Sequence, residues 1–154
     1  MSTSLPDIDP SLPATDPVAM NKFNQLLIDQ FRARGGKLGG QLAGAPILLL
    51  NTVGAKTGRA RTTPLGYIRD EGRYVVAASK AGAPANPDWY YHLAACPTAT
   101  VEIGTDTFDV RSAVAQGKER SRLFQLLAVQ WPMQVDYQQK TTRQIPIVVL
   151  ERLA

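Results

Sequence analysis

The stretch NTVGAKTGRARTTPLGY, residues 51–67, carries three basic side chains and no acidic one. No Asp or Glu occurs between Asp29 and Asp70, so the basic bias extends well beyond this stretch. The lysines and arginines inside these limits are Arg32, Arg34, Lys37, Lys56, Arg59, Arg61 and Arg69. Cationic side chains that lack neighbouring acids attract anions. The sequence therefore predicts a site for a negatively charged ligand in this part of the chain.

The segment GAKTG, residues 54–58, contains the residue types of a nucleotide-binding P-loop but not its pattern. A P-loop needs an earlier glycine, a lysine directly after a glycine, and a following helix, whereas Lys56 follows Ala55 and precedes a predicted strand. We expect instead a glycine-containing turn whose backbone N–H groups and cations bind an anion without nucleotide-specific geometry. A solvated loop between two strands is the alternative.

A second group of candidate residues lies at the end of a predicted strand, within AASKAGAPANPDWYYHL, residues 77–93. Small side chains at a strand end let a flat ligand approach the backbone, and here they are Ala77, Ala78 and Ser79. Lys80 adds a cation, and Trp89 and Tyr90 follow on a predicted short helix. Aromatic residues on such a helix are usually core residues, but these would also suit a planar cofactor with a charged tail.

The chain has one cysteine, Cys96, and one histidine, His92. An internal disulfide is therefore excluded, and too few soft ligands remain for a zinc site, so we expect no metal. A serine hydrolase would need His92 as its base, and a helical histidine beside aromatic residues is more often a structural group. Because no other reactive group stands out, we expect a bound cofactor to supply the chemistry while the protein binds and orients it.

The 154-residue chain has the length of one domain, and its 44% hydrophobic and 19% charged residues are typical of a globular protein. We expect residues 1–15 to be extended or disordered and residues 16–154 to form the domain. The sequence shows neither a secretory signal nor an apolar run long enough to cross a bilayer, which favours a cytoplasmic protein. No nucleic-acid partner is expected, because the basic segment lacks a recognition helix or a repeated stacking platform.

The first predicted helix begins at the Asp16–Pro17 pair and ends before Gly35. Apolar residues recur along it at helical spacing, at Met20, Phe23, Leu27 and Phe31. Its basic end allows two interpretations: the helix packs on the domain, or it makes a peripheral contact with an anionic membrane surface. Packing is the commoner role of such a helix.

Short strands dominate the rest of the chain. Residues 46–53, 61–70 and 73–79 are predicted to form an antiparallel meander, with a turn at 70–72. Further strands are predicted at 98–103, 107–115 and 145–151, and helices at 88–96 and 118–131. We therefore expect an α+β fold, a small β-barrel with helices outside the barrel.

Three motifs connect these elements to a known family. They are K-T-G-x-x-R-x-x-P at 56–64, A-S-K-x-G before N-P-x-W-Y at 78–90, and R-x-I-P-I-V-V at 143–149. In this order, within residues 45–151, the chain resembles the deazaflavin (F420)-dependent nitroreductase family of actinobacteria, including its mycobacterial members that activate nitroimidazoles. The resemblance implies a split β-barrel and coenzyme F420, an 8-hydroxy-5-deazaflavin with a phosphodiester and a polyglutamate tail. A polyanionic tail would explain the basic stretch.

The resemblance also implies site residues. The tail would be bound by Lys56, Thr57, Arg61 and Thr62, with help from Lys80. The ring would lie against Pro64, Ala77, Ala78 and Ser79, between the walls formed by Trp89 and Tyr90. The acceptor would meet Trp131, Gln134 and Tyr137, and Ser79, Tyr137 or water would deliver a proton. The implied activity is hydride transfer from reduced F420 to quinone, nitro or other activated acceptors, and relatives with this fold also suggest a homodimer.

The sequence departs from the family pattern at four positions. Ala55 stands where close relatives often carry a base, and Gly66, Trp131 and Gln134 replace aromatic residues of the nitroimidazole-activating members. We expect these changes to disfavour bulky bicyclic nitroimidazoles. Two alternatives stay open: a split barrel that uses FMN as an oxidoreductase, and a protein that binds F420 without efficient turnover.

Overall fold

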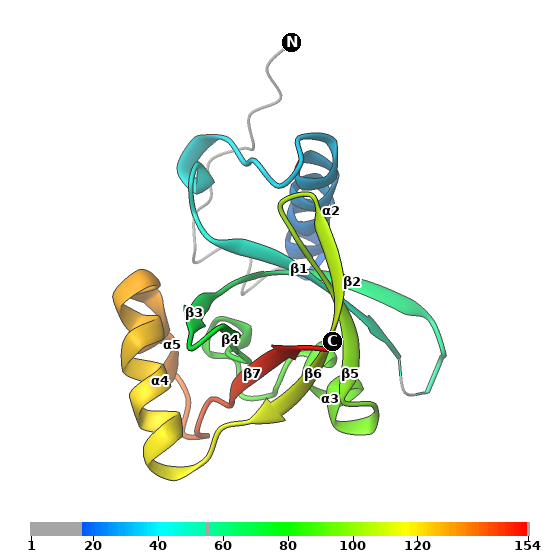
Figure 1. Ribbon diagram of the computed structural model, residues 1–154. Coiled ribbons are helices and arrows are strands. Elements are labelled where there is room, and N and C mark those ends of the chain that lie inside the picture. Colours follow the sequence, from blue (N-terminus) through cyan, green and yellow to red (C-terminus); the bar gives the residue numbers. More distant parts are fainter. Residues whose placement is uncertain (1–16, 55, 154) are drawn as a thin grey trace.

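The computed structural model of the protein describes residues 17–54 and 56–153. The segment 1–15, predicted to be extended or disordered, lies outside the described residues, as do Asp16 and Ala55. The described strands form one curled antiparallel sheet, a half-barrel with helices outside it (Figure 1). This is the α+β architecture expected from the sequence.

The strands agree with the predicted segments except in one region. They are β1 (Ile47–Val53), β2 (Ala60–Gly66), β3 (Ile68–Asp70), β4 (Arg73–Ala77), β5 (Thr98–Ile103), β6 (Asp106–Val114) and β7 (Ile147–Arg152). The α-helices are α2 (Pro17–Ala33), α3 (Asp88–Ala95), α4 (Gly117–Gln130) and α5 (Met133–Gln139). Two 3-10 turns, η1 (Gly40–Leu42) and η2 (Lys80–Gly82), complete the described elements. Helix α5 was not predicted, since it is short and mostly polar.

The predicted meander is wrong, because β2 and β3 lie at opposite ends of the strand order β2-β1-β5-β6-β7-β4-β3. The predicted strand 61–70 breaks at Tyr67, so that β2 pairs with β1 and β3 pairs with β4. Only this residue separates the two ends of the sheet, so the sheet must curl to bring them together. The backbone N–H of Tyr67 donates to the carbonyl of Pro46, at 3.0 Å, which holds the break in place.

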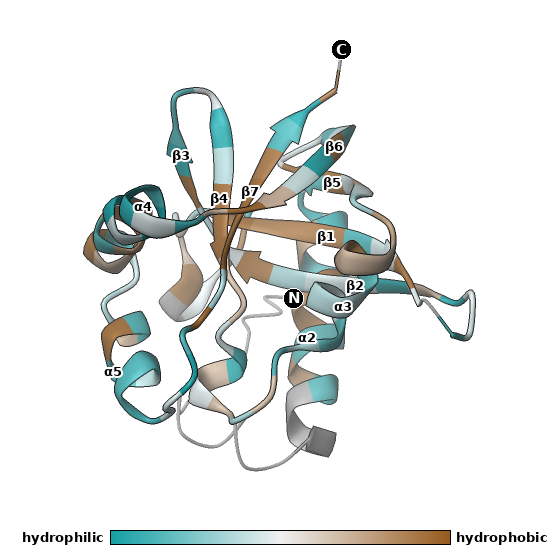
Figure 2. Cartoon of the chain, turned by 90° about the horizontal axis from the view of Figure 1, so that it is seen from below, coloured by the Kyte–Doolittle hydropathy of each residue, from teal (hydrophilic) through white to brown (hydrophobic). Residues whose placement is uncertain are grey.

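Several strands are buried on both faces, which explains their continuous apolar runs. In β1, Leu48 and Leu50 face a core cluster that includes Trp89 of α3, while Ile47 and Leu49 pack against α2. Strands β4 and β7 likewise place alternate residues against that cluster and against α4. Figure 2 shows the hydrophobic colour concentrated on β1, β4 and β7. The helices therefore have fixed positions on the outside of the curled sheet.

Helix α2 packs on the sheet, as the commoner interpretation of its sequence predicted. Leu27, Ile28 and Phe31 are buried against β1. A polar network adds to this contact, because Arg32 donates to Glu102 of β5 at 2.8 and 3.1 Å. Asn51 Nδ2 donates to the same carboxylate at 2.9 Å. The hydrogen bond with Arg32 is the main cause of the lowered pKa of Glu102.

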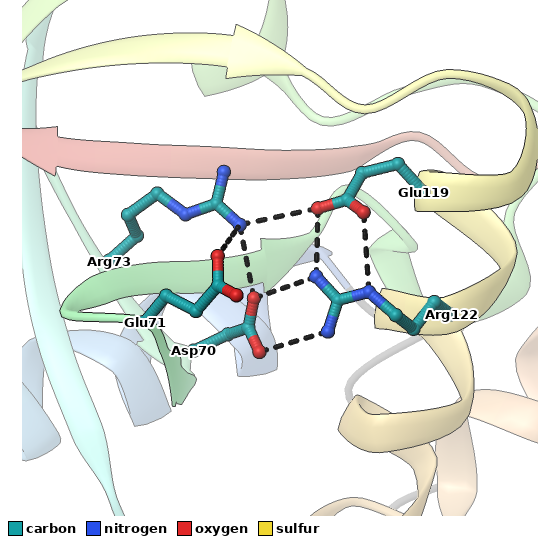
Figure 3. A network of polar contacts seen from close by, with 5 residues as sticks. All are labelled: Asp70, Glu71, Arg73, Glu119 and Arg122. Atoms are coloured by element: carbon teal, nitrogen blue, oxygen red, sulfur yellow. Dashed lines mark hydrogen bonds and ion pairs between the residues drawn. The ribbon is translucent and has the colours of Figure 1, made fainter.

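An ion-pair network joins α4 to the β3–β4 hairpin (Figure 3). Arg122 of α4 donates to both oxygens of Asp70, at 2.8 and 3.0 Å, and to Glu119 at 2.8 Å. Arg73 of β4 donates to Asp70 at 3.0 Å and to Glu119 at 3.2 Å. The two arginines, with Asp70 and Glu119, thus bridge the helix and the hairpin.

No helix among the described residues is long and apolar enough to cross a membrane.

Candidate functional site

A cavity of about 440 Å³ is lined by residues of α2, β2, the β4–α3 segment, α3 and α5. This volume lies within the range of about 300 to 1,000 Å³ that is usual for small-ligand sites. Part of its wall is apolar and is formed by Phe23, Leu27, Leu42, Ile47 and Leu65. The cavity is therefore large enough for a planar ligand and partly dry.

The cavity brings together predicted residues that are far apart in the sequence. From the predicted cofactor side it is lined by Arg61, Pro64, Ala77, Ser79, Lys80 and Trp89. From the predicted acceptor side it is lined by Trp131, Gln134 and Tyr137. Most of these residues come from strand ends and loops, so the curl of the sheet and the packing of α5 determine their proximity.

Five predicted residues do not line the cavity. Lys56 and Thr57 are exposed in the β1–β2 turn, which projects from the rest of the sheet (Figure 1). Thr62 does not line the cavity, and its hydroxyl donates to Asn51 Oδ1 at 2.6 Å. Ala78 is fully buried, and Tyr90 packs against the core with its ring centroid 5.6 Å from that of Tyr91.

The segment after β4 has an uncommon backbone conformation. Lys80, Ala81 and Gly82 have φ angles of 47°, 54° and 84°. The left-handed conformation costs a non-glycine residue about 1 to 2 kcal/mol, so the surrounding contacts must hold it. Arg143 supplies many of these contacts, since it donates to the carbonyl of Ser79 at 2.9 Å. We did not assign a role to Arg143 from the sequence, although it begins the R-x-I-P motif.

Trp131 fills the space beside Gly66. A Cβ atom added to Gly66 would lie 2.5 Å from Cε2 of the indole, closer than real Cβ contacts allow. The indole Nε1 donates to the carbonyl of Tyr67 at 3.1 Å, which fixes the ring at the break between β2 and β3. The two departures from the family pattern at positions 66 and 131 are therefore a matched pair.

Polar groups in the cavity are available to a ligand. Gln134 Oε1 is buried and has no hydrogen-bond partner among the described residues. Burial raises the pKa of the half-buried Tyr137, and the charge of Asp136 raises it further. Ser79 lines the cavity with a side chain that is 7% exposed. Ser79 and Tyr137 are therefore the hydroxyl-bearing candidates for contact with a bound molecule.

Sequence reasoning did not place His92 or the polar residues of α2 at the cavity. His92 lines it while its Nδ1 lies 2.8 Å from Thr52 Oγ1, which agrees with the structural role expected of it. Asn21 and Asn24 of α2 form part of the wall, although the helix was expected only to pack. The 3.6-residue spacing of α2 shows which face is buried but not which edge reaches a cavity.

Among the described residues, no group of three or more His, Cys, Asp or Glu side chains is arranged to hold a metal ion.

Comparison with known proteins identifies the family. The family model of the F420H(2)-dependent quinone reductases matches residues 25–152. An F420H(2)-dependent quinone reductase of Mycobacterium tuberculosis is 40% identical over 126 residues, which cover 79% of this chain and 85% of that protein.

Two solved structures are also similar. One, described as an F420-H2 dependent reductase (FDR-A), is 37% identical with a TM-score of 0.64, over 69% of this chain and 94% of that one. A second, described as a domain-swapped dimer, is 31% identical with a TM-score of 0.67, over 88% and 100% of the two chains. These matches confirm the split-barrel fold and the dependence on coenzyme F420 that the motifs implied. The chain belongs to the F420H(2)-dependent quinone reductase family.

Proposed function

We propose that this protein transfers a hydride from reduced coenzyme F420 to a quinone, a nitro compound or another activated acceptor bound in the 440 Å³ cavity. The observation that supports this proposal best is the joint lining of one cavity by the two predicted sets of residues. Ser79 and Lys80 represent the cofactor set, and Gln134 and Tyr137 represent the acceptor set. Two rings that react by hydride transfer must lie close together, so a shared cavity is what the chemistry requires.

The cofactor side of the cavity fits a planar ring with an anionic tail. Pro64, Ala77 and Ser79 have small side chains that leave room for a ring, and Trp89 closes the wall. Arg61 and Lys80 bring positive charge to the cavity, where an arginine can pair with a phosphate or carboxylate in bidentate geometry.

The remaining predicted cofactor residues have secondary parts in the proposal. Lys56 and Thr57, on the projecting turn, would meet the distal part of the tail. Thr62 and Ala78 have no direct contact with the cofactor in the proposal. The hydroxyl of Thr62 is already bonded to Asn51, Ala78 is buried, and the backbone N–H and carbonyl of Ala78 are bonded to Pro146 and Arg143. Tyr90 would support Trp89 from within the core.

The acceptor side provides hydrogen bonds and a proton. When bound, reduced F420 supplies a hydride to the acceptor. Tyr137, whose hydroxyl is protonated at neutral pH as in any tyrosine, donates to an oxygen of the acceptor. Gln134 lines the acceptor side of the cavity together with Tyr137. The hydroxyl of Ser79, or water, is a second route for the proton.

The proposal includes a homodimer. It is supported by the 31% identical structure described as a domain-swapped dimer. Light scattering of the purified protein tests it. The proposal does not include the membrane contact considered from the sequence, because the described part of α2 turns Leu27, Ile28 and Phe31 inward and leaves Leu26 as its exposed large apolar side chain.

A fluorescence titration with F420, run beside FMN, tests the cofactor assignment. We expect saturable binding that is selective for F420, followed by oxidation of reduced F420 when a water-soluble quinone or a nitroaromatic compound is added. Preference for FMN, or no binding of either, would contradict the proposal. Tight F420 binding without turnover on either acceptor class would instead indicate an F420-binding protein.

A further inference from the structure

The guanidinium group of Arg143 holds an entire loop of the cavity. Arg143 lies between α5 and β7, and its side-chain hydrogen bonds reach residues 78–86. The acceptors are the carbonyls of Ala78 (3.3 Å), Ser79 (2.9 Å), Ala83 (3.0 Å) and Ala85 (3.1 Å), and Oδ1 of Asn86 (2.6 Å). One side chain therefore binds acceptors along the full length of this loop.

The loop needs such support because its own hydrogen bonds are few. Within it, the N–H of Gly82 donates to the carbonyl of Ser79 and the N–H of Ala83 donates to that of Lys80. Lys80 and Ala81 have positive φ angles, which non-glycine residues keep only when their surroundings fix them. Arg143 adds a second hydrogen bond to the carbonyl of Ser79 and also binds the carbonyls of Ala78, Ala83 and Ala85.

This loop connects the two sides of the cavity. Ser79 and Lys80 line it from the cofactor side. Gly82 lies against α5, since a Cβ atom added to it would be 2.8 Å from the carbonyl oxygen of Tyr137. A change in the backbone of 79–82 would therefore shift Ser79 and Lys80. It would also change their distance from the acceptor residues on α5.

We propose that Arg143 is a positioning residue for hydride transfer: by binding four carbonyls and Asn86, it fixes the backbone that aims Ser79 and Lys80 into the cavity. The inference rests on the proposed function of the cavity. Arg143 does not line the cavity and acts through the loop. A lysine cannot replace it, because only the planar guanidinium has donors that point in several fixed directions.

The test compares Arg143→Lys with Arg120→Lys as a matched control. Arg120 is also partly buried, but its side chain donates to residues outside the loop 78–86, namely the carbonyl of Ile145 at 2.8 Å and Gln138 at 3.0 Å. We expect Arg143→Lys to raise the dissociation constant of F420 about tenfold or more and to lower kcat with a quinone. Arg120→Lys should change both values less than about twofold, even if it lowers the thermal midpoint of unfolding as much as Arg143→Lys does.

Two further readouts separate positioning from general stability. Low millimolar guanidinium should restore F420 binding to Arg143→Ala but not to the control. Hydrogen exchange of peptide 78–86, measured without cofactor, should be faster in Arg143→Lys than in the wild type and unchanged in the control. If Arg143→Ala does not fold, Asn86→Ala, which removes the side-chain acceptor, should show a smaller effect in the same direction.

Some results would overturn the inference. Unchanged F420 affinity and kcat in Arg143→Lys would do so while leaving the proposed function intact. Equal losses of affinity in Arg143→Lys and Arg120→Lys would show a merely structural role. If the wild type does not bind F420, the proposed function fails, and the exchange measurement then decides separately whether Arg143 holds the loop.

Discussion

At the residue scale, existing hydrogen bonds influence which side chains of β2 are free to meet the ligand. Arg61 lines the cavity, whereas the hydroxyl of Thr62 next to it is bonded to Asn51. Lys56 lies further out on the β1–β2 turn. Of the cations in residues 51–67, Arg61 therefore lies at the cavity, whereas Lys56 can meet only the extended tail of the cofactor.

Replacing Arg61 with Ala should weaken F420 binding about tenfold or more, because a lost hydrogen bond to a charged group costs about 1.5 to 3 kcal/mol. Lys56→Ala should have a smaller effect, since the turn is exposed. Fluorescence titration measures both, with Arg111→Ala on β6 as a control of equal charge. Wild-type affinity in the Arg61 variant would remove this residue from the site.

The Tyr137→Phe variant tests the proton donor. The hydroxyl of Tyr137, whose pKa is raised by burial, should contribute to kcat and not to F420 affinity. We expect kcat with a quinone to fall by about tenfold or more, as is usual for the loss of a general acid, while the dissociation constant of F420 stays unchanged. Loss of both quantities together would indicate a structural role for Tyr137.

The matched pair of Gly66 and Trp131 predicts strong coupling between two substitutions. Gly66→Tyr must displace the indole, so it should destabilise the protein on its own. Trp131→Ala should cost less than the roughly 3 to 5 kcal/mol of a fully buried aromatic truncation and should raise kcat/KM for bulky bicyclic acceptors.

In the double variant, Gly66→Tyr should be far less harmful, because the space it needs has been vacated. Urea unfolding of the wild type, both single variants and the double variant gives the coupling energy. Simple additivity would mean that the two positions are independent.

At the element scale, the ion pairs between α4 and the β3–β4 hairpin predict acid sensitivity. Hydrogen bonds from Arg122, and then from Arg73, lower the pKa of Asp70 from 3.8 to about 2. A carboxylate with a lowered folded-state pKa stabilises the fold fully above its unfolded pKa, and this contribution is lost as the pH falls toward the folded pKa. Stability should therefore drop between pH 3.8 and about 2.

The Asp70→Asn variant checks this assignment. It should be less stable than the wild type at neutral pH, and the difference should shrink as the pH falls from 3.8 to about 2. Urea midpoints measured across this range provide the comparison. Asp106→Asn is the control, since its pair with Arg152 is long, at 3.5 Å, and more than half exposed on both sides. A constant difference between wild type and Asp70→Asn would contradict the role of the charge.

At the scale of the whole molecule, the formal net charge of +4 and the exposed cations near the cavity favour a polyanionic cofactor. Salt screens exposed charges over a Debye length of about 10 Å at 0.1 M. We therefore expect the F420 dissociation constant to rise several-fold as salt is increased from about 0.05 to 0.5 M, mainly through slower association. Stopped-flow fluorescence measures this rate, and KM for a neutral quinone serves as the control. A salt-independent association rate would show that the cationic stretch does not steer the cofactor.

The sequence by itself determined the local structure and the chemical class of the site. Residues 88–96 and 118–131 were predicted as helices and match α3 and α4 within one residue at each end. The cations of residues 56–61 and the small residues at the end of β4 indicated an anionic, planar cofactor. Such features depend on neighbours along the chain, since periodicity and strand-end composition are local properties.

The tertiary structure decided strand pairing and the composition of the cavity wall. It broke the predicted strand at Tyr67, added α2 to the wall, and brought Arg143 to a loop about sixty residues earlier in the chain. It also bonded the hydroxyl of Thr62 to Asn51 and placed Trp131 on Gly66. Local patterns state which residues of an element share a face. Which partner that face meets depends on how the sheet curls and packs, and these contacts join residues that no local pattern connects.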